Sequence, residues 1–353
     1  MSRIFSRHSA GSVSPRTLKA GLVPIAVEVS PGRSALVAFS DGSTSKSSCL
    51  RCETASCMTY ADTEVVSNSL ADFPADRNPS VCPANAITRK NGAAPIISPD
   101  SCMLCGVCAS RCPVGAIRMV PYAVIDDTQR EAFPETESLD ESLTAISVFA
   151  GIPKTGEFLV ESDAIVDDMR SRLLAAWGRT GDRFPDHLAR NLLIASGAGA
   201  AMRRKGDNAA RMDIALGAPW PAFGCAEAEF GDVAILDAPR DLMDDVAVCV
   251  GRLGKDKDSI VALVVTDVLP NRRSEYWRIL QDVRKVLEVK IGTVTVLALC
   301  LLVWRRKKIS ALPVDLFYVD VETESYRTAV LEPLIGRKLK IGPEPRPSVE
   351  VAK

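Results

Sequence analysis

The sequence is poor in histidine. Its 353 residues include only His8 and His187, and neither stands in a pattern typical of catalysis. The chain also contains no Walker phosphate-binding loop, no G-x-G-x-x-G fingerprint and no Ser/His/Asp set. These absences argue against the commonest nucleotide-binding and hydrolase families. His187 falls early in a predicted helix, where we expect it to be a surface residue.

Long apolar runs are missing as well. The most apolar run, Val294–Trp304, is shorter than the roughly 20 residues that a bilayer-spanning helix needs, and it predicts a buried strand. No signal peptide is visible, and the chain is too large for a secreted scaffold held by disulfides. We therefore expect a soluble, cytoplasmic protein in a reducing compartment, with no membrane contact.

Neither sign of charge dominates. The chain has 43 lysines and arginines against 44 aspartates and glutamates, a formal net charge of −1, so it points to no particular charged partner. Basic residues are in excess only in the C-terminal half, from residue 170 onward, which would suit nucleic acid as a partner. Ordinary solvated surface charge is the alternative explanation of this excess.

Cysteine, by contrast, is abundant and clustered. Most of the 11 cysteines fall between residues 49 and 112, and the strongest pattern runs from Cys102 to Pro113. There, four cysteines stand at gaps of two, two and three residues, and a proline follows the last. This is the spacing with which a bacterial-type ferredoxin loop holds a [4Fe–4S] cluster. Three of the thiolates bind one cluster, and the fourth serves a neighbouring cluster.

A weaker copy of this pattern precedes it. Cys49, Cys52 and Cys57 stand at gaps of two and four residues. Cys82 and its following proline come after an insertion of about twenty residues relative to the ferredoxin pattern. The two halves then continue alike, as Cys82-Pro-Ala-Asn-Ala-Ile and Cys112-Pro-Val-Gly-Ala-Ile. Over residues 45–122 the chain resembles the two-cluster bacterial ferredoxin family.

This resemblance implies crossed ligation, in which the last cysteine of each half binds the cluster of the other half. It also implies a short strand at Ile96-Ile97, electron transfer as the activity and a redox partner protein. The four-residue gap leaves the type of the first cluster open between a regular [4Fe–4S], a distorted and a [3Fe–4S] form. Cluster 1 would take Cys49, Cys52, Cys57 and Cys112, and cluster 2 would take Cys82, Cys102, Cys105 and Cys108.

Zinc is the alternative occupant, because C-x2-C pairs also suit four-cysteine zinc sites. Structural zinc would use two separated pairs, whereas the segment from Cys102 to Cys112 places four cysteines on one short loop. Small residues such as Gly106 and Gly115 also let backbone N–H groups approach cluster sulfurs closely. The spacing therefore favours iron–sulfur clusters for both sets of cysteines.

The remaining segments complete the predicted domain organisation. Residues 1–44 would form a tail and a β-hairpin that pairs Leu22–Val29 with Ala35–Phe39, and residues 123–161 an acidic linker. Two helices follow, over 165–177 and over Asp186–Lys205. Beyond them we predict strands at 209–216, 224–230, 233–236, 260–265, 294–304 and 316–321, and helices at 240–251 and 274–288.

Apolar strands between helices imply a sheet covered on both faces. Residues 162–353 therefore read as an α/β domain with a mixed central sheet, which makes the whole chain α+β and α/β. The αβββαβ order resembles the PD-(D/E)xK restriction-endonuclease-like fold over about 185–305. That resemblance implies that Asp213, Glu227 and Glu229 are catalytic and bind Mg²⁺, although Glu229 stands where most members have lysine. Alternatively, these acids line the wet face of an antiparallel pair.

Three functions follow from these patterns. The first is an iron–sulfur protein whose two clusters transfer electrons or sense redox state beside an α/β domain. The second is a metal-dependent DNA nuclease whose clusters are structural or gate its activity. The third is a non-catalytic interaction subunit that its clusters brace. Only the second of these makes the chain a hydrolytic enzyme, a Mg²⁺-dependent phosphodiesterase.

Overall fold

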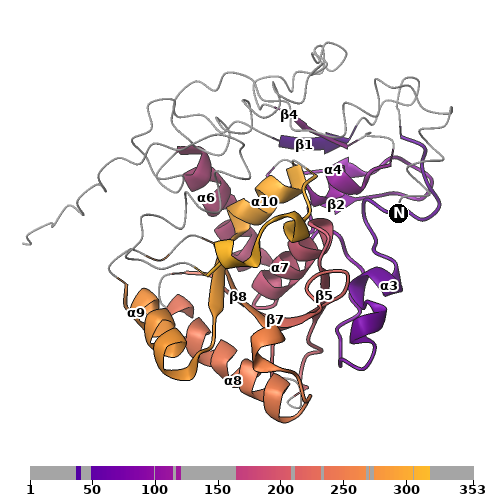
Figure 1. Cartoon of the computed structure of the whole chain (residues 1–353). Coiled ribbons are helices and arrows are strands. Elements are labelled where there is room, and N and C mark those ends of the chain that lie inside the picture. Colours follow the sequence, from indigo (N-terminus) through magenta and orange to yellow (C-terminus); the bar gives the residue numbers. More distant parts are fainter. Residues whose placement is uncertain are drawn as a thin grey trace, which may run out of the picture.

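The computed structural model describes residues 37–40, 49–98, 100–113, 117–120, 164–207, 211–231, 234–267, 270, 274–304 and 306–318. The predicted strand at 22–29 and the predicted acidic linker lie outside the described residues. The described elements share one hydrophobic core, which runs from the cysteine-rich segment into the C-terminal sheet (Figure 1). No helix in these ranges has the length and apolar character needed to cross a membrane.

The cysteine-rich segment contains two short antiparallel strand pairs. β2 (Ile87–Thr88) pairs with β3 (Ile96–Ile97), so the strand predicted before the second cysteine loop is confirmed. β1 (Val37–Ser40) pairs with β4 (Ile117–Val120), and α4 (Val107–Arg111) lies within the second loop. In each pair one strand precedes a cysteine loop and the other follows a Cys-Pro turn. The strand pairing therefore reproduces the internal repeat of the sequence.

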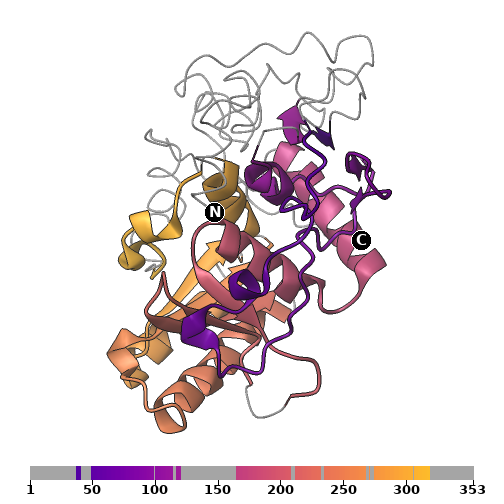
Figure 2. The ribbon, with the colours of Figure 1, turned by 90° about the vertical axis from the view of Figure 1, so that its right-hand side faces the viewer.

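The insertion in the first half of this segment folds against the C-terminal domain. It contains α3 (Asp62–Val65) and a 3₁₀ turn, Asn68–Leu70. The chain then runs along the edge of the C-terminal sheet, where Ala75 forms an isolated antiparallel bridge with Arg203. Figure 2 shows this indigo to purple segment passing down the side of the C-terminal domain. The insertion thus joins the two parts of the molecule.

The C-terminal domain is a five-stranded sheet with helices on both faces. Its strands are β5 (Gly199–Met202), β6 (Ile214–Gly217), β7 (Phe223–Glu229), β8 (Val261–Thr266) and β9 (Ile291–Thr295). Its helices are α6 (Ala164–Thr180), α7 (Phe184–Ala195), α8 (Ala238–Gly251), α9 (Glu275–Asp282) and α10 (Val296–Trp304). In the view of Figure 1, α7 and α10 lie above the sheet and α8 and α9 below it.

The strands lie in the order β5-β6-β7-β8-β9. β5, β6 and β7 are antiparallel neighbours, whereas β7, β8 and β9 run parallel, so the predicted mixed sheet is confirmed. A helix, three strands, a helix and a strand do follow one another, as α7, β5, β6, β7, α8 and β8, but β5 falls in a predicted helix and the third predicted strand, at 233–236, is absent. Every residue of β5, β6, β8 and β9 is buried, as expected for a sheet covered on both faces.

The helix predicted over Asp186–Lys205 is wrong in its second half. α7 ends well before Lys205, and Gly197, at a φ of 90°, turns the chain into β5. Gly199 is the first residue of that strand. A Cβ at this position would lie 2.2 Å from the carbonyl oxygen of Ala218, so only glycine fits there. Small residues therefore specify a close approach of two backbone segments here. The cations at 203–205 follow a strand and do not end a helix.

The single strand predicted over Val294–Trp304 is also wrong, because this run changes structure within itself. It ends β9 and then forms α10, whose Ala298 N–H donates to Thr295 Oγ1 at 3.1 Å. Apart from Thr295 the run is apolar and shows no periodicity. Only this capping threonine therefore signals the change from strand to helix. The segment predicted as a strand at 233–236 forms a 3₁₀ turn, and the described start of 316–321 ends another.

The other predicted elements of this domain are present. α6, α8 and α9 occupy segments whose apolar spacing predicts helices, and β6, β7 and β8 lie at predicted strands. α9 continues as a π-helical turn over Val283–Leu287. Leu287, at the end of this turn, is 50% exposed, because the wider π-helical turn shifts the helical register.

Candidate metal centre

The structure divides the eight clustered cysteines into two groups. Cys49, Cys52, Cys57 and Cys112 line one small cavity, together with Arg89. Cys112 ends the second loop in sequence, yet it lies among the cysteines of the first half. Crossed ligation requires this arrangement.

The second group holds Cys82 with the three other cysteines of the second loop. Burial raises the pKa of the Cys105 thiol, and the neighbouring sulfurs of Cys82 and Cys102 raise it further. Burial and the sulfurs of Cys102, Cys105 and Cys82 also raise the pKa of Cys108. These thiols are therefore costly to ionise on their own. A bound metal cluster would supply the positive charge that stabilises them as thiolates.

Single-ion and cluster sites place different demands on such groups. In the described ranges, no three cysteine, histidine, aspartate or glutamate side chains converge in the way that one metal ion requires. A single zinc ion would need four sulfurs at about 2.3 Å from one centre. A four-iron cluster instead binds each thiolate through a different iron, so separated sulfurs are compatible with it.

The two ligand loops share an unusual backbone geometry. Arg51 and Leu104 occupy the same place in their loops, directly before the second cysteine, and both have positive φ angles, 49° and 68°. Each donates its backbone N–H to the first sulfur of its loop. Arg51 donates to Cys49 Sγ and Leu104 to Cys102 Sγ, both at 3.4 Å. Such N–H groups stabilise thiolate ligands, and they bind equivalent sulfurs in both halves.

Gly106 provides a test of the second loop. It lies between two of the cysteines with a φ of 77° and caps α4. Alanine in this left-handed conformation costs about 1–2 kcal/mol. We expect Gly106→Ala to lower the thermal unfolding midpoint by about 4 °C and to speed the loss of cluster absorbance in chelator. The control is Gly178→Ala in α6, where a Cβ would meet nothing within 4 Å. Equal behaviour of the two variants would contradict the assignment of strain to this loop.

A buried arginine ties the two halves together beside the first group. Arg111 directly precedes Cys112, is 6% exposed and donates from Nε to the Ser56 carbonyl at 2.7 Å. Its guanidinium pairs with Glu64 at 3.0 Å and lies 3.9 Å from the ring centre of Tyr60. Because Ser56 belongs to the first loop, these contacts hold ligands from both halves at one cavity. No local sequence pattern predicts this long-range contact.

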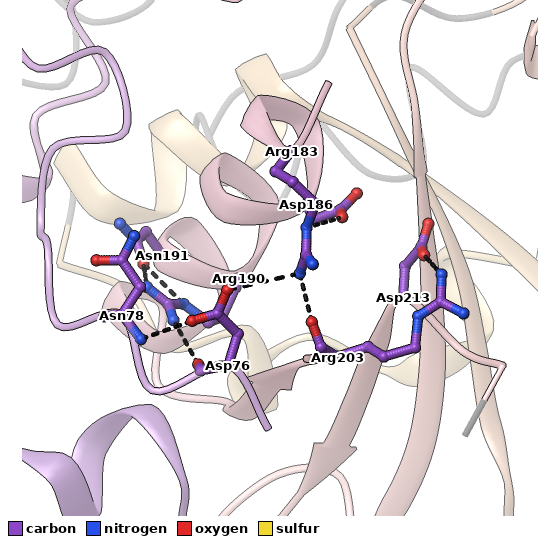
Figure 3. A network of polar contacts seen from close by, with 8 residues as sticks. All are labelled: Asp76, Asn78, Arg183, Asp186, Arg190, Asn191, Arg203 and Asp213. Atoms are coloured by element: carbon purple, nitrogen blue, oxygen red, sulfur yellow. Dashed lines mark hydrogen bonds and ion pairs between the residues drawn. The ribbon is translucent and has the colours of Figure 1, made fainter. Parts of the chain in front are cut away.

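α7 holds the segment that leads to Cys82 (Figure 3). Arg190 and Asn191 are 0% exposed, and both donate to carbonyls of that segment. Arg190 Nη2 donates to the Asn78 carbonyl at 2.9 Å, and Asn191 Nδ2 donates to the carbonyls of residues 80 and 81, each at 3.0 Å. A buried guanidinium needs such acceptors. The approach to one proposed ligand is therefore part of the core of the C-terminal domain.

His187 belongs to the same contact and is not the surface residue that its position predicts. It is 8% exposed, and its Nε2 lies 3.0 Å from the Ser80 carbonyl oxygen, to which the Nε2-protonated tautomer donates. Burial lowers the pKa of His187 to about 4, so the ring is neutral near pH 7. The neutral ring adds no charge to the core beside Arg190.

Comparison with known proteins identifies the second loop. Residues 95–118 match the family model described as a 4Fe-4S binding domain. This segment is a 4Fe–4S ferredoxin-type domain, and the chain is an iron–sulfur protein. A protein of Methanocaldococcus jannaschii named as an uncharacterized ferredoxin is 49% identical over 37 residues, which are 10% of this chain and 24% of that relative. The chain thus spans about a quarter of the curated relative. No solved structure matches it.

Each cysteine group has two buried and two half-buried members, but the two loops have different surroundings. Around the ferredoxin-type domain, Cys102 and Cys105 are buried, at 9% and 8% exposed, and α4 packs against α7 and α10. In the first group, Cys49 and Cys52 are half-buried, beside Leu50 at 46% exposed. The second loop therefore packs against the C-terminal domain, whereas the first loop places Leu50 at the surface.

The predicted catalytic carboxylates gather at one place in the C-terminal sheet. Asp213 precedes β6, and its backbone N–H donates to Glu227 Oε1 in β7 at 3.3 Å. Arg203 Nη2 pairs with Asp213 Oδ1 at 3.1 Å (Figure 3). Burial and the charge of Asp213 raise the pKa of Glu229, farther along β7, to about 7. Glu227 is only 5% exposed, so it does not lie on a wet face.

Two carboxylates that the sequence did not single out join this cluster. Asp186 of α7 pairs with Arg183 at 3.2 Å, and its pKa is raised to about 8 by burial and then by the charge of Asp213. Asp245 of α8 is 2% exposed and shares a hydrogen bond with Glu227, while its Oδ2 has no partner among the described residues. For Asp245 one sequence signal was present, because Asp237, Asp241 and Asp245 recur every four residues, a spacing that places them on one face of a helix.

Proposed function

We propose that the chain holds two [4Fe–4S] clusters with crossed ligands and transfers electrons through them. The observation that carries the proposal is the position of Cys112, which lines the same cavity as the cysteines of the first half. The electrostatic contact of Cys82 with Cys105 supports the reciprocal assignment. Cluster 1 takes Cys49, Cys52, Cys57 and Cys112, and cluster 2 takes Cys82, Cys102, Cys105 and Cys108.

The presence of four cysteines at the first cavity supports a four-iron form of cluster 1, despite the four-residue gap. Arg89 lines that cavity, so positive charge is available to a cluster that gains an electron. The backbone N–H donors of Arg51 and Leu104 act in the same direction at both clusters. When bound, a [4Fe–4S] cluster supplies one-electron transfer.

A redox titration followed by EPR tests this function. Two one-electron reductions should appear within the known range of iron–sulfur potentials, about −700 to +450 mV. The reduced protein should then pass its electrons to an added one-electron acceptor such as oxidised cytochrome c. If the bound clusters take up no electron in this range, their role is structural, and the chain is better described as a non-catalytic interaction subunit.

A metal-dependent DNA nuclease is the second candidate. It is supported by the hydrogen bond from the Asp213 N–H to Glu227. Asp186 lies near them because its partner Arg183 donates to the carbonyl of Arg203, which pairs with Asp213. Carboxylate oxygens are the ligands that Mg²⁺ prefers. Among the described residues no three of these acids converge as one metal ion requires, so they would have to move together to bind it. α7 both carries Asp186 and holds the segment before a proposed cluster ligand. Loss of that cluster would therefore disturb the carboxylates.

Glu227→Gln tests the nuclease. If the carboxylate binds Mg²⁺, the change should slow DNA cleavage with Mg²⁺ or Mn²⁺ by at least about a hundredfold, because one ligand charge is lost. Glu288→Gln is the matched control, since the Glu288 side chain is 82% exposed and far along the chain from the cluster of acids. Equal cutting by both variants, or no cutting of any DNA by the intact protein, would remove the candidate.

A further inference from the structure

A cavity of about 350 Å³ lies between part of the insertion and the C-terminal sheet, and neither proposed function uses it. Residues 69–74 of the insertion form one wall, and β6, β7 and the end of α8 form the others. At roughly 30 Å³ per water molecule it holds about a dozen waters, which is within the size range of small-molecule sites. We propose that this cavity binds a small organic anion with an apolar, ring-sized body.

Apolar side chains from separate parts of the chain line the cavity. Leu70 of the insertion, Met212 before β6 and Val248 of α8 are buried residues, at 3%, 1% and 8% exposed, that still face this space. Phe73 and Phe223 are half-buried and add aromatic surface. A ligand with an apolar body would remove this surface from water, which favours binding.

The charges at the cavity favour an anionic end group. Arg252 and Lys255 both come from the turn that follows α8, and Lys255 Nζ lies 4.6 Å from the ring centre of Phe223. Asp72, on the insertion wall, is the acidic residue of the lining. Asp72 and the roughly half negative charge at the C-terminus of α8 offset part of this charge, and the two cations remain in slight excess. A carboxylate or sulfonate is therefore best placed at the end near residues 252–255.

The insertion is fitted closely enough to the sheet to form a fixed wall. A Cβ on Gly217 of β6 would lie 2.6 Å from Ser69 Oγ and 3.0 Å from a Leu70 side-chain carbon. Glycine at this position thus permits the 3₁₀ turn of the insertion to rest on the strand. The insertion before Cys82, which departs from the ferredoxin pattern, therefore supplies one wall of the cavity. The sheet alone would not enclose it.

Isothermal titration calorimetry of the intact protein tests the site with two probes. They are 1-naphthoate and the neutral 1-naphthalenemethanol, which share one ring system. One naphthoate should bind per chain, at least about tenfold more tightly than the alcohol. The double variant Arg252→Glu with Lys255→Glu should weaken naphthoate about tenfold and leave the alcohol unchanged. Lys205→Glu, at an exposed lysine outside the cavity, is the charge control.

A variant that fills the cavity provides an independent test. Ala215 is 1% exposed and lines the cavity, so Ala215→Phe should abolish binding of both probes while cluster absorbance stays unchanged. If that variant fails to fold, the charge-reversal pair decides alone. The proposal is overturned if naphthoate gives no binding heat, if both probes bind equally, or if the Ala215→Phe protein binds as the parent does. Cluster content, measured alongside, reports separately on the iron–sulfur proposal.

Discussion

Replacement of Cys105 by serine is expected to halve the iron and acid-labile sulfide of the purified protein, from about eight of each per chain to about four. Cys105 is 8% exposed, and the loop that carries it packs through α4 against α7 and α10. Cluster binding and folding are coupled in ligand-dense segments of this kind. The variant should therefore also unfold at a lower temperature than the parent protein.

Cys249→Ser is the matched control for this experiment. Cys249 is equally buried, at 0% exposed, but it lies in α8 and belongs to neither cysteine group. Its replacement should leave iron and sulfide at the level of the parent. Unchanged sulfide in Cys105→Ser would show that this cysteine is not a ligand. An equal loss in Cys249→Ser would show that the assay reports general instability.

Paired replacements distinguish crossed from uncrossed ligation. With crossed ligands, Cys52 and Cys112 serve the same cluster, so Cys52→Ser with Cys112→Ser should retain about four irons per chain. Cys52→Ser with Cys82→Ser removes one ligand from each cluster and should leave almost no iron. Uncrossed ligation predicts the reverse order for these two double variants. Iron analysis, with EPR of the reduced proteins, separates the two outcomes.

Single variants at Cys52, Cys82 and Cys112 are the controls for these pairs, and each should retain about four irons. Both double variants contain the same Cys52→Ser change, so they differ only in the second replacement, and the single variants report how that replacement alone affects iron content. If the single variants retain about four irons, equal iron in the two double variants would contradict both ligand schemes. If the single variants have lost all iron, one cluster cannot persist without the other.

The sequence predicted best those features that depend on local spacing. The gaps from Cys102 to Cys112 suffice to predict a [4Fe–4S] loop, because the loop's own backbone brings three sulfurs together. The apolar spacing of α8 and α9 and the β-branched run of β8 likewise report local periodicity. These elements were predicted correctly, whereas β5 and α10 were not.

Features that depend on distant contacts escaped prediction. The pairing of Arg111 with Glu64, and the hold of Arg190 on the carbonyl of Asn78, join residues far apart in sequence, and no local pattern predicts such a contact. His187 was predicted as exposed because the segment that covers it lies in the insertion. Buried polar groups find partners through the tertiary fold, which the spacing of neighbours does not reveal.

The boundaries that failed have a different cause. At Gly199 a strand begins where helical spacing continued, because the backbone of Ala218 approaches too closely for any side chain. In the run that ends β9 and begins α10, every position except Thr295 is apolar, so neither period is visible. In both places the tertiary environment decided the local structure against a weak local signal.

Chemical analysis of anaerobically purified protein tests the central claim most directly. Iron, acid-labile sulfide and zinc should be measured on one sample, with the EPR spectrum of the dithionite-reduced protein. The account predicts about eight irons and about eight sulfides per chain, little zinc and signals from two interacting clusters. Stoichiometric zinc without sulfide would contradict the iron–sulfur assignment, and about four of each element would contradict the second cluster.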